Sequence, residues 1–576
     1  MISDTNPHIT RGYVSVASAC GGSKLVHYRC CGSGPAVVLL HDSPRSSRLH
    51  VPLMKVLGRR FRVFALDTPG YGNSDPIGLD KPTIPDFARA LGDALDALGL
   101  RQAPVYATHT SAKIALALAA RGGTMPLLVL DGLSIPDQLA SDDFIAAYMR
   151  PFAPEPTGAF LSAEWSRTRD MLRWFPWFST RPEHRIAMEP PTPEWMEDYG
   201  IDLFSAGPHY ADAYTAAMRW NPLDDLHSVQ VPTIVGARTD DVLYPHLDKV
   251  PCAANPALSV ERLGTDRTAW ANWIAENLAT GSSDPAPARP ASDTTARGYV
   301  AFAQSQIHWQ RFSGPCTGEQ RPLMILAGPS TLEAMNWAEA MRVHRPVIVP
   351  DLPGFGDSDP LPDTSAAAIA DALAALIGRL EPEPCDVLAI GLVAPIGAMM
   401  AARRPGLVAT LTVIGAPPFD AATDAVLLPP VAFDALAGSH LHQFWHMLRD
   451  GTVQWPWYSA APDAARPAPD LPDANVLHGA LTGMLKQRTT YGSAIAAGLT
   501  VHDAALWQSV QPRTFVAVGD DPATAQAAKL IDLLPASTAF MLPSDRKAAA
   551  AALHATLVRA DHGAPEKAAS EKVSAV

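Results

Sequence analysis

Residues 65–76 read Ala-Leu-Asp-Thr-Pro-Gly-Tyr-Gly-Asn-Ser-Asp-Pro, and residues 349–360 read Val-Pro-Asp-Leu-Pro-Gly-Phe-Gly-Asp-Ser-Asp-Pro. The chain therefore contains the same strand-exit loop twice, and 284 residues separate Asp67 from Asp351. That separation is the length of a whole α/β domain, so the pattern indicates a duplicated domain rather than a short structural repeat.

Other matched pairs keep nearly the same separation along the whole chain. The N-terminal members are Arg11–Val14, Trp165, Arg169-Asp170, Pro176-Trp177 and Asp266-Arg267, and their partners are Arg297–Val300, Trp445, Arg449-Asp450, Pro456-Trp457 and Asp545-Arg546. We therefore predict two homologous domains at 1–280 and 296–562. A Pro/Ala/Ser-rich linker at 281–295 separates them, and a small, charged tail follows at 563–576.

Composition narrows the class of protein. With 576 residues and 47% hydrophobic content the chain can bury two large cores, and its net charge of −13 argues against a nucleic-acid partner. It contains no apolar run of membrane-spanning length and no signal pattern, and its six cysteines have no metal-binding spacing. We expect a reduced cytoplasmic protein with no membrane partner. With no phosphate loop, metal-ligand cluster or nicotinamide fingerprint, we expect no cofactor.

Strand-length apolar runs alternate with helix-length amphipathic patterns in the first half. The predicted strands are 36–41, 61–67, 105–108, 127–131, 232–236 and 258–263, and the predicted helices are 84–99 and 111–121. This alternation predicts a mostly parallel sheet covered by helices on both faces. In such a sheet the ligand site lies at the carboxyl ends of the strands.

One long segment interrupts the alternation in each half. Residues 135–228 are rich in Trp, Pro, Tyr and Met, and we predict that they form a helical cap over the strand ends, with an equivalent cap at 417–505. Packing within the cap is the favoured role of its aromatic residues, including Trp165. Arg169 is either part of a structural ion pair with Asp170 or a charge directed into the cleft.

The combination of these strands with the two loops Asp-x-Pro-Gly-[Tyr/Phe]-Gly-x-Ser-Asp resembles the α/β-hydrolase superfamily over nearly the whole chain. Its capped branch includes esterases, epoxide hydrolases, haloalkane dehalogenases and C–C hydrolases. The resemblance implies two tandem α/β-hydrolase domains, each with a doubly wound sheet and a helical cap inserted after the sixth strand.

The resemblance also implies a nucleophile on a tight Gly-x-Ser-x-Gly elbow. Aligned on residues 108–112, Thr-His-Thr-Ser-Ala, the nucleophile position holds Thr110, and His109 is expected to pack into the sheet. In the second half the aligned stretch is 391–395, with Val393 at that position. Because valine cannot attack a substrate, we expect the second half to be catalytically silent.

The family acid and base occupy loops after later strands. Asp241 is the predicted acid, with Asp240 as the second choice. The family histidine is missing, since both halves have Asp-Arg in its place, at Asp266-Arg267 in the first. His41 is the candidate base, although a packing role for it is the favoured alternative.

Further polar residues are candidates for binding. The backbone N–H groups of Asp42 or Ser43 and of Ser111 would hold an oxyanion or carboxylate. Arg45 and Arg267 would hold an anionic ligand, and Trp165 and Arg169 complete the candidate binding set. Lys113 lies one turn after Thr110 and reaches either the cleft or solvent.

Three functions remain open from the sequence. The first is an unconventional hydrolase or lyase in the N-terminal half, acting on a small carbonyl or ester-type substrate, with the second half as a scaffold that replaces a homodimer partner in an intramolecular pseudo-dimer. The second is a pseudo-hydrolase that binds a small molecule or a protein. The third is non-hydrolytic chemistry such as cofactor-free oxygenation or decarboxylation, which requires a base but no acyl-enzyme.

Overall fold

The computed structural model describes residues 7–18, 21–186, 191–281, 296–315, 320–381, 383–419, 427–466, 471–519 and 522–561. The predicted linker beyond residue 281 and the predicted tail from 563 lie outside the described residues. The chain forms two compact units. Unit 1 comprises Met1–Gly298, Ala432–His446 and Asp473–Thr482, and unit 2 comprises Tyr299–Val431, Met447–Pro472 and Gly483–Val576.

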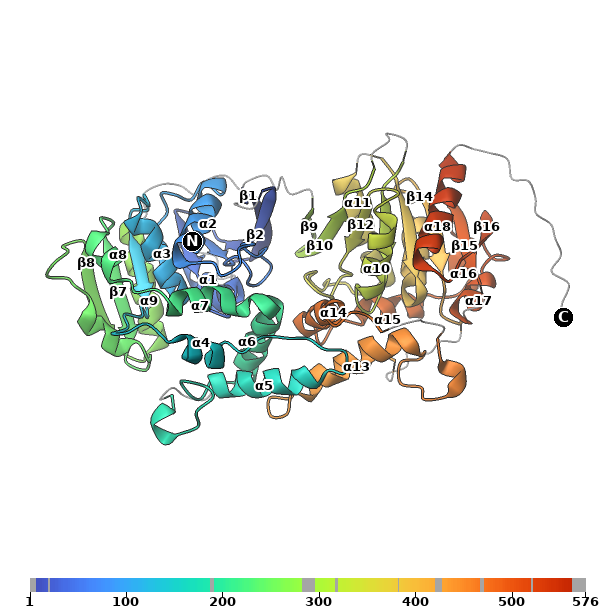
Figure 1. Cartoon of the computed structure of the whole chain (residues 1–576). Helices are drawn as coiled ribbons and strands as arrows, with labels where there is room; N and C mark the ends of the chain where they lie inside the picture. Colours follow the sequence, from blue (N-terminus) through green and yellow to red (C-terminus); the bar gives the residue numbers. More distant parts are fainter. Residues whose placement is uncertain are drawn as a thin grey trace. The chain divides into compact units, whose positions relative to one another are not determined.

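The sheet of unit 1 has eight strands in the order β1-β2-β4-β3-β5-β6-β7-β8. Figure 1 labels its strands β1, β2, β7 and β8. The strands are β1 (Thr10–Ala17), β2 (Ser23–Cys31), β3 (Ala36–Leu40), β4 (Arg62–Leu66), β5 (Val105–Thr108), β6 (Leu128–Asp131), β7 (Thr233–Arg238) and β8 (Leu258–Leu263). The β1–β2 and β2–β4 pairs are antiparallel, and the remaining pairs are parallel. The carboxyl ends of β3 to β8 therefore lie along one edge.

Helices cover both faces of this sheet. They are α1 (Val51–Leu57), α2 (Ile84–Ala97), α3 (Thr110–Ala120) and α9 (Arg267–Gly281). Val37 and Leu39 of β3 pack in one core cluster with residues of α1 and α9. Leu40 instead lies beside residues of α2 and α3 on the other face. Successive strand residues point to opposite faces, so β3 is apolar on both sides.

Unit 2 repeats the plan, with sheet order β16-β15-β14-β13-β11-β12-β10-β9. Its strands are β9 (Arg297–Phe302), β10 (Ser305–Phe312), β11 (Leu323–Leu326), β12 (Val347–Pro350), β13 (Cys385–Ile390), β14 (Val408–Ile414), β15 (Arg513–Val518) and β16 (Ser537–Met541). Its flanking helices are α10 (Leu332–Met341), α11 (Ala366–Leu380), α12 (Ala394–Arg403), α17 (Pro522–Ala528) and α18 (Arg546–Asp561). The predicted fold class is confirmed in both halves.

A helical segment follows the sixth strand of each sheet. Between β6 and β7 lie α4 (Asp142–Tyr148), α5 (Ala159–Met171), α6 (Pro193–Ala206), α7 (Asp212–Met218) and α8 (Leu223–Ser228), which we call the cap of unit 1. Between β14 and β15 lie α13 (Ser439–Val453), α14 (Ala474–Lys486), α15 (Ser493–Thr500) and α16 (Ala504–Gln508). Across the described part of the chain, no helix has the length and apolar character needed to span a bilayer.

Candidate active site

The sharp turn between β5 and α3 is centred on His109. This residue has φ 45° and ψ −108°, a left-handed conformation that residues with a side chain rarely adopt. Thr110 is instead the first residue of α3 and is 6% exposed. The predicted register of the elbow was therefore wrong by one residue: the position that faces out from the strand-to-helix turn holds a histidine, not a threonine.

His109 is paired with the carboxylate after β7. Its Nε2 atom lies 2.8 Å from Oδ2 of Asp241, and its side chain is 38% exposed. Gly132, the residue after β6, provides the space for this pair, because a Cβ atom there would lie 2.6 Å from Nε2 of His109. The ends of three neighbouring strands therefore form one His–Asp dyad. The sequence analysis had instead predicted that His109 packs into the sheet and that Asp241 orients a different base, His41.

The dyad has a strong electrostatic preference for its charged form. Burial opposes a charge on His109, but the carboxylate of Asp241 outweighs this and raises the pKa of His109 to about 9. Burial likewise raises the pKa of Asp241, and the charge and hydrogen bond of His109 reverse this and lower it to about 2. At neutral pH the elbow therefore holds an imidazolium, with Nε2–H donated to Asp241.

His41, the candidate base, is engaged through both ring nitrogens. Its Nδ1 atom lies 2.7 Å from the backbone oxygen of Asp42, and its Nε2 atom accepts the backbone N–H of Thr68 at 2.9 Å. The side chain is 1% exposed, and the hydroxyl of Ser111 donates to its backbone oxygen. This geometry supports the packing alternative for His41 and also makes Ser111 a structural contact.

Arg45 does not point to a free binding surface, because it anchors the cap. Its Nε donates to Oδ2 of Asp202 on α6 at 2.8 Å, and Ser46 donates to the other carboxylate oxygen at 2.6 Å. Its guanidinium lies 4.8 Å from the ring centre of Trp195, and Arg45 is 2% exposed. One guanidinium nitrogen, Nη1, is buried with no hydrogen-bond partner in the described residues.

Asp42 lies among the ionisable groups of this region. One of its carboxylate oxygens, Oδ1, is buried without a hydrogen-bond partner in the described part of the chain. Its negative charge contributes to raising the pKa of His109 after burial and the larger effect of Asp241, and it also acts on Tyr199 of α6. The hydroxyl of Ser43, next in sequence, interacts with Tyr71.

The remaining candidates lie away from the dyad or serve other contacts. Asp240 accepts from Nε of Arg238 at 2.9 Å, and Arg267 is 60% exposed and lies 3.7 Å from a carboxylate oxygen of Asp240. Trp165 is buried against Phe433 and His440 and does not approach His109 in any described contact. Nε of Arg169 is buried on α5. In the other half the equivalent Arg449 and Asp450 form an ion pair of 2.6 Å.

The side chain of Lys113 does not reach solvent. It is 3% exposed, and its Nζ donates to the backbone oxygens of Ala217 and Trp220, at 2.8 and 2.7 Å, where the chain leaves α7. Burial lowers its pKa to about 7. Lys113 therefore ties the cap to α3.

The elbow of unit 2 holds no side chain at all. Gly391 has φ 61°, whereas Val393 lies two residues later at the start of α12 and is fully buried. The predicted register was wrong here as well, since Val393 is not the elbow residue. The expectation of a silent second site gains support, because glycine offers no reacting group.

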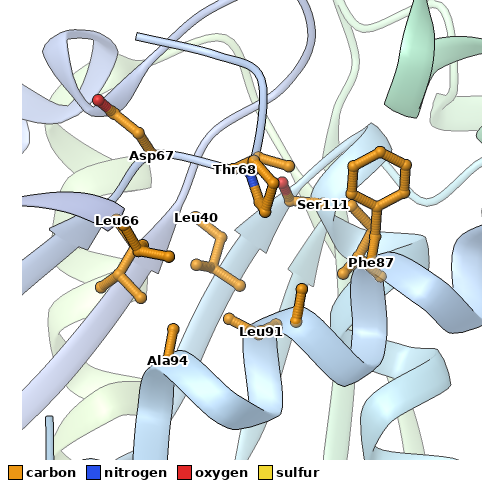
Figure 2. Close-up of a pocket in the computed structure, with 12 residues that line it drawn as sticks. Leu40, Leu66, Asp67, Thr68, Phe87, Leu91, Ala94 and Ser111 are labelled. Atoms are coloured by element: carbon orange, nitrogen blue, oxygen red, sulfur yellow. The ribbon is translucent and has the colours of Figure 1, made fainter. Parts of the chain in front are cut away.

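A small cavity of about 20 Å³ lies between β3, β4, α2 and α3 (Figure 2). Its walls are mostly apolar, with Leu40, Leu66, Phe87 and Leu91 facing it. Asp67, which also lines it, already accepts hydrogen bonds from His27 and from the backbone of Ser47 and Asn73. The cavity has room for about one water molecule and is a packing gap below the site.

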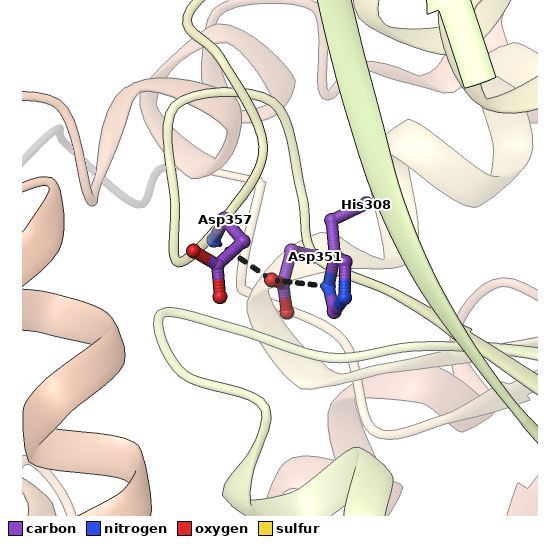
Figure 3. A group of neighbouring side chains, drawn as sticks. All are labelled: His308, Asp351 and Asp357. Carbon is purple, nitrogen blue, oxygen red and sulfur yellow. Dashed lines mark hydrogen bonds and ion pairs between the residues drawn. The ribbon is translucent and has the colours of Figure 1, made fainter. Parts of the chain in front are cut away.

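His308, Asp351 and Asp357 of unit 2 bring three possible metal-ligand atoms within 4.8 Å of one another (Figure 3). Nδ1 of His308 lies 2.9 Å from Oδ2 of Asp351, and the backbone N–H of Asp357 donates to the same oxygen. Nζ of Lys486 lies 2.9 Å from Asp357. Unit 1 has the same network with His27 and Asp67 but with Asn73 in the third position. The network fixes the repeated loop, and we assign no metal to it.

The fold agrees with the family comparisons. A model described as the alpha/beta hydrolase family matches residues 37–301, and a model described as the alpha/beta hydrolase fold matches residues 327–497. The chain belongs to the α/β-hydrolase family. The two matches lie in the two halves of the duplication, which confirms two tandem α/β-hydrolase domains.

Individual α/β-hydrolases match over shorter stretches. A 2-hydroxy-6-oxononadienedioate/2-hydroxy-6-oxononatrienedioate hydrolase of Dechloromonas aromatica is 34% identical over 18% of this chain and 39% of its own length. A haloalkane dehalogenase of Mycobacterium bovis is 38% identical over 13% of this chain and 26% of its own length. The chain thus spans less than half of either relative. Among solved structures, a thermophilic esterase from Thermogutta terrifontis is 19% identical, covers 48% of this chain and all of its own, and has a TM-score of 0.37.

The sequence interpretation left His109 out of the candidate site, although the structure places it at the turn between β5 and α3. The five residues 107–111, Ala-Thr-His-Thr-Ser, place His109 at the centre with small residues on both sides. The alternative frame 108–112 has small outer residues too, so side-chain size does not choose between them. The positive φ of His109 shows that the frame 107–111, centred on His109, forms the elbow.

Proposed function

We propose that the N-terminal half is an unconventional hydrolase or lyase for a small carbonyl or ester-type substrate, and that His109 is its proton-transfer group. The observation that supports this most directly is the dyad itself. A partly exposed imidazole occupies the elbow, and the carboxylate of Asp241 holds its Nε2 atom at 2.8 Å. A histidine whose second nitrogen is fixed by a carboxylate is oriented for proton transfer through its other nitrogen.

The protonation state sets the role of His109. Because Asp241 raises its pKa to about 9, His109 carries a proton at neutral pH and acts as an acid. Its Nδ1 atom makes no hydrogen bond to any described residue, so this N–H is available for a carbonyl oxygen. A donor at this position stabilises the negative charge that develops when the carbonyl is attacked.

Asp42 supplies the complementary base. Its Oδ1 atom is buried without a partner among the described residues, and its charge acts on His109. In hydrolysis, Asp42 accepts a proton from water as the water oxygen bonds to the carbonyl carbon. His109 protonates the carbonyl oxygen, and that proton returns as the bond to the leaving group breaks. The leaving group departs with the proton held by Asp42, which restores both residues.

The comparison with named relatives agrees with a carbonyl substrate. The Dechloromonas relative is named as a hydrolase of a 2-hydroxy-6-oxo compound, which carries a ketone. The match covers 39% of that protein, so it supports the substrate class rather than a particular compound.

The alternative function is a pseudo-hydrolase that binds a small molecule or protein without turnover. Two observations favour it: no hydroxyl or thiol occupies the elbow, and Arg267 stands where the family histidine would be. Under this alternative, the imidazolium of His109 binds an anionic group and releases it unchanged.

Turnover of a panel of short-chain esters, thioesters and β-diketones by the full-length protein tests the proposal. We expect His109→Gln to lower kcat by about 10²–10⁴, as for loss of a general acid. Asp42→Asn should cause a loss of similar size, and Thr110→Ala is the matched control, with activity within a few-fold of wild type.

Two outcomes would overturn the proposal. Activity that survives His109→Gln but vanishes in Thr110→Ala would return the chemistry to a hydroxyl nucleophile. If the wild-type protein turns over no member of the panel, the hydrolase assignment fails. Saturable binding of a carboxylate ligand, weakened by His109→Gln, would then establish the binding alternative.

A further inference from the structure

Two tryptophans and two glycines make crossed contacts within unit 1. Gly158 precedes α5 with φ 82°, and a Cβ atom there would lie 2.7 Å from Cδ1 of Trp445. Gly438 precedes α13 with φ 70°, and a Cβ atom there would lie 2.5 Å from Cγ of Trp165. Each glycine therefore leaves the space that the tryptophan of the other helix occupies.

These four residues are two pairs of duplicates. Gly438 follows Gly158 by 280 residues, and Trp445 follows Trp165 by the same number. When residue i contacts j′ and the equivalent residue i′ contacts j, the contact is reciprocal, as in the interface of a twofold dimer. The duplication has thus placed both members of a self-complementary contact in one chain.

Both tryptophans are fully packed in this contact. Trp445 is completely buried, lies edge-on to Phe160 with ring centres 5.2 Å apart, and donates its Nε1–H to the backbone oxygen of Pro156 at 3.2 Å. Trp165 is 2% exposed and lies edge-on to His440 with ring centres 5.1 Å apart. Aromatic residues buried in this way supply much of the contact energy of an interface.

A second segment from the C-terminal half supports α6. His478 of α14 lies 5.9 Å from Phe204 on α6 and 5.0 Å from Phe152, measured between ring centres. Helix α6 also carries Asp202, which holds Arg45 in the loop after β3. Burial lowers the pKa of His478 to about 4, so it packs as a neutral ring.

We infer that residues 432–446 and 473–482, here called the docking segments, give the catalytically silent C-terminal half a function: they fix the cap of unit 1 through the reciprocal tryptophan–glycine contacts. Trp445 contacts the start of α5, and His478 contacts α6. Asp202 of α6 in turn holds Arg45 in the loop after β3. A single hydrolase domain with this surface would receive it from a second copy of itself. Here the second copy is in the same chain, and its surviving role is to position, not to react.

Hydrogen–deuterium exchange on the full-length protein without substrate tests this inference independently of the proposed catalysis. Trp445→Ala should raise amide exchange in α5, at 159–171, by at least tenfold, although the substitution lies in α13. Trp165→Ala should do the same in 439–446. Strands β3 to β6 should exchange as in the wild-type protein.

Trp177→Ala is the matched control, because Trp177 lies in the same cap and donates its Nε1–H to the backbone oxygen of Tyr148 on α4. It should leave exchange in 439–446 unchanged. If each tryptophan variant loosens only its own helix, the inference is wrong. Should Trp445→Ala fail to fold, Gly158→Ala gives the same readout from the other side of the contact, and unchanged exchange in 439–446 there would contradict the inference equally.

Discussion

His109 and Asp241 meet across Gly132, so that the ends of β5, β6 and β7 form one acid–base pair. Each strand end contributes a different property. His109 has a strained backbone, Gly132 leaves room for the imidazole because it has no side chain, and the carboxylate of Asp241 raises the pKa of the imidazole. Changing any one of the three should alter the pKa of His109 without unfolding the sheet.

Gly132→Ala should separate the pair. A Cβ atom there would lie 2.6 Å from Nε2 of His109 and 3.1 Å from Oδ2 of Asp241, and Gly132 has φ 73°. We expect the pKa of His109 to fall from about 9 toward its usual value near 6.5, which NMR titration of the ring proton would measure. Gly415→Ala is the control, because Gly415 follows β14 with φ 72°. An unchanged His109 titration in Gly132→Ala would mean that the dyad does not depend on this space.

Asp241→Asn should remove a pH-dependent contribution to stability. The pKa of His109 is raised by the pair, so its contribution is fully present below about 6.5 and is lost as pH rises through about 9. The pKa of Asp241 is lowered, so its contribution is lost as pH falls through about 2. Because the pair is partly exposed, we expect it to contribute up to about 1 kcal/mol to the free energy of unfolding.

Thermal melts at pH 6, 8 and 10 would measure this effect. The difference in Tm between wild type and Asp241→Asn should be largest at pH 6 and smallest at pH 10. Asp240→Asn is the control, since Asp240 pairs with Arg238 instead of His109. A difference that grows toward pH 10 would contradict the assigned charge state.

Lys113→Met should loosen the cap by leaving the carbonyls of Ala217 and Trp220 without their donor. We expect a loss of about 1–3 kcal/mol, the cost of unsatisfied buried groups. Because burial lowers the pKa of Lys113 to about 7, the folded protein binds fewer protons than the unfolded chain between pH 7 and about 10.5. Wild type should therefore gain stability over the variant as pH rises through this range. Denaturant unfolding at pH 6.5 and 9.5 would measure this gain, and a difference that does not change with pH would show that burial does not lower the pKa of Lys113.

Asp202→Asn should be severely destabilising because it leaves the guanidinium of Arg45 buried and unpaired. We expect a loss of about 3–5 kcal/mol in the free energy of unfolding. Asp198→Asn is the control on the same helix. Asp198 is 49% exposed and lies 3.7 Å from Arg48, so its loss should cost less than about 1 kcal/mol. Similar losses in the two variants, measured by chemical denaturation, would show that Arg45 does not depend on its buried partner.

The sequence predicted the sheet well and the site only in part. The apolar run at 105–108 coincides with β5, because a strand buried on both faces leaves a strong pattern. The predicted strand at 258–263 coincides with β8, an edge strand of which only Leu258 is buried. The position of Asp241 after β7 was also predicted. The elbow register was not, since small residues surround both His109 and Thr110 and only the backbone angle distinguishes them.

Contacts between distant segments explain the other failures. Arg45 reads as an anion-binding residue in the sequence, but its partner Asp202 lies 157 residues away in a helix whose position no local pattern specifies. Trp165 was recognised as the duplicate of Trp445, yet the pattern gave no sign that each would meet the glycine of the other's helix. Such contacts depend on the whole packing of the cap rather than on spacing along the chain.

The two elbows differ in the free-energy cost of their backbone conformation. His109 holds a left-handed backbone with a full side chain, a conformation that costs about 1–3 kcal/mol, whereas Gly391 adopts its φ of 61° with little penalty. Packing elsewhere in the N-terminal half must offset this cost for His109 to keep its conformation. The C-terminal half does not carry this backbone cost, so it can accumulate destabilising substitutions of that size and still fold. Mutational tolerance should therefore be greater in the C-terminal half.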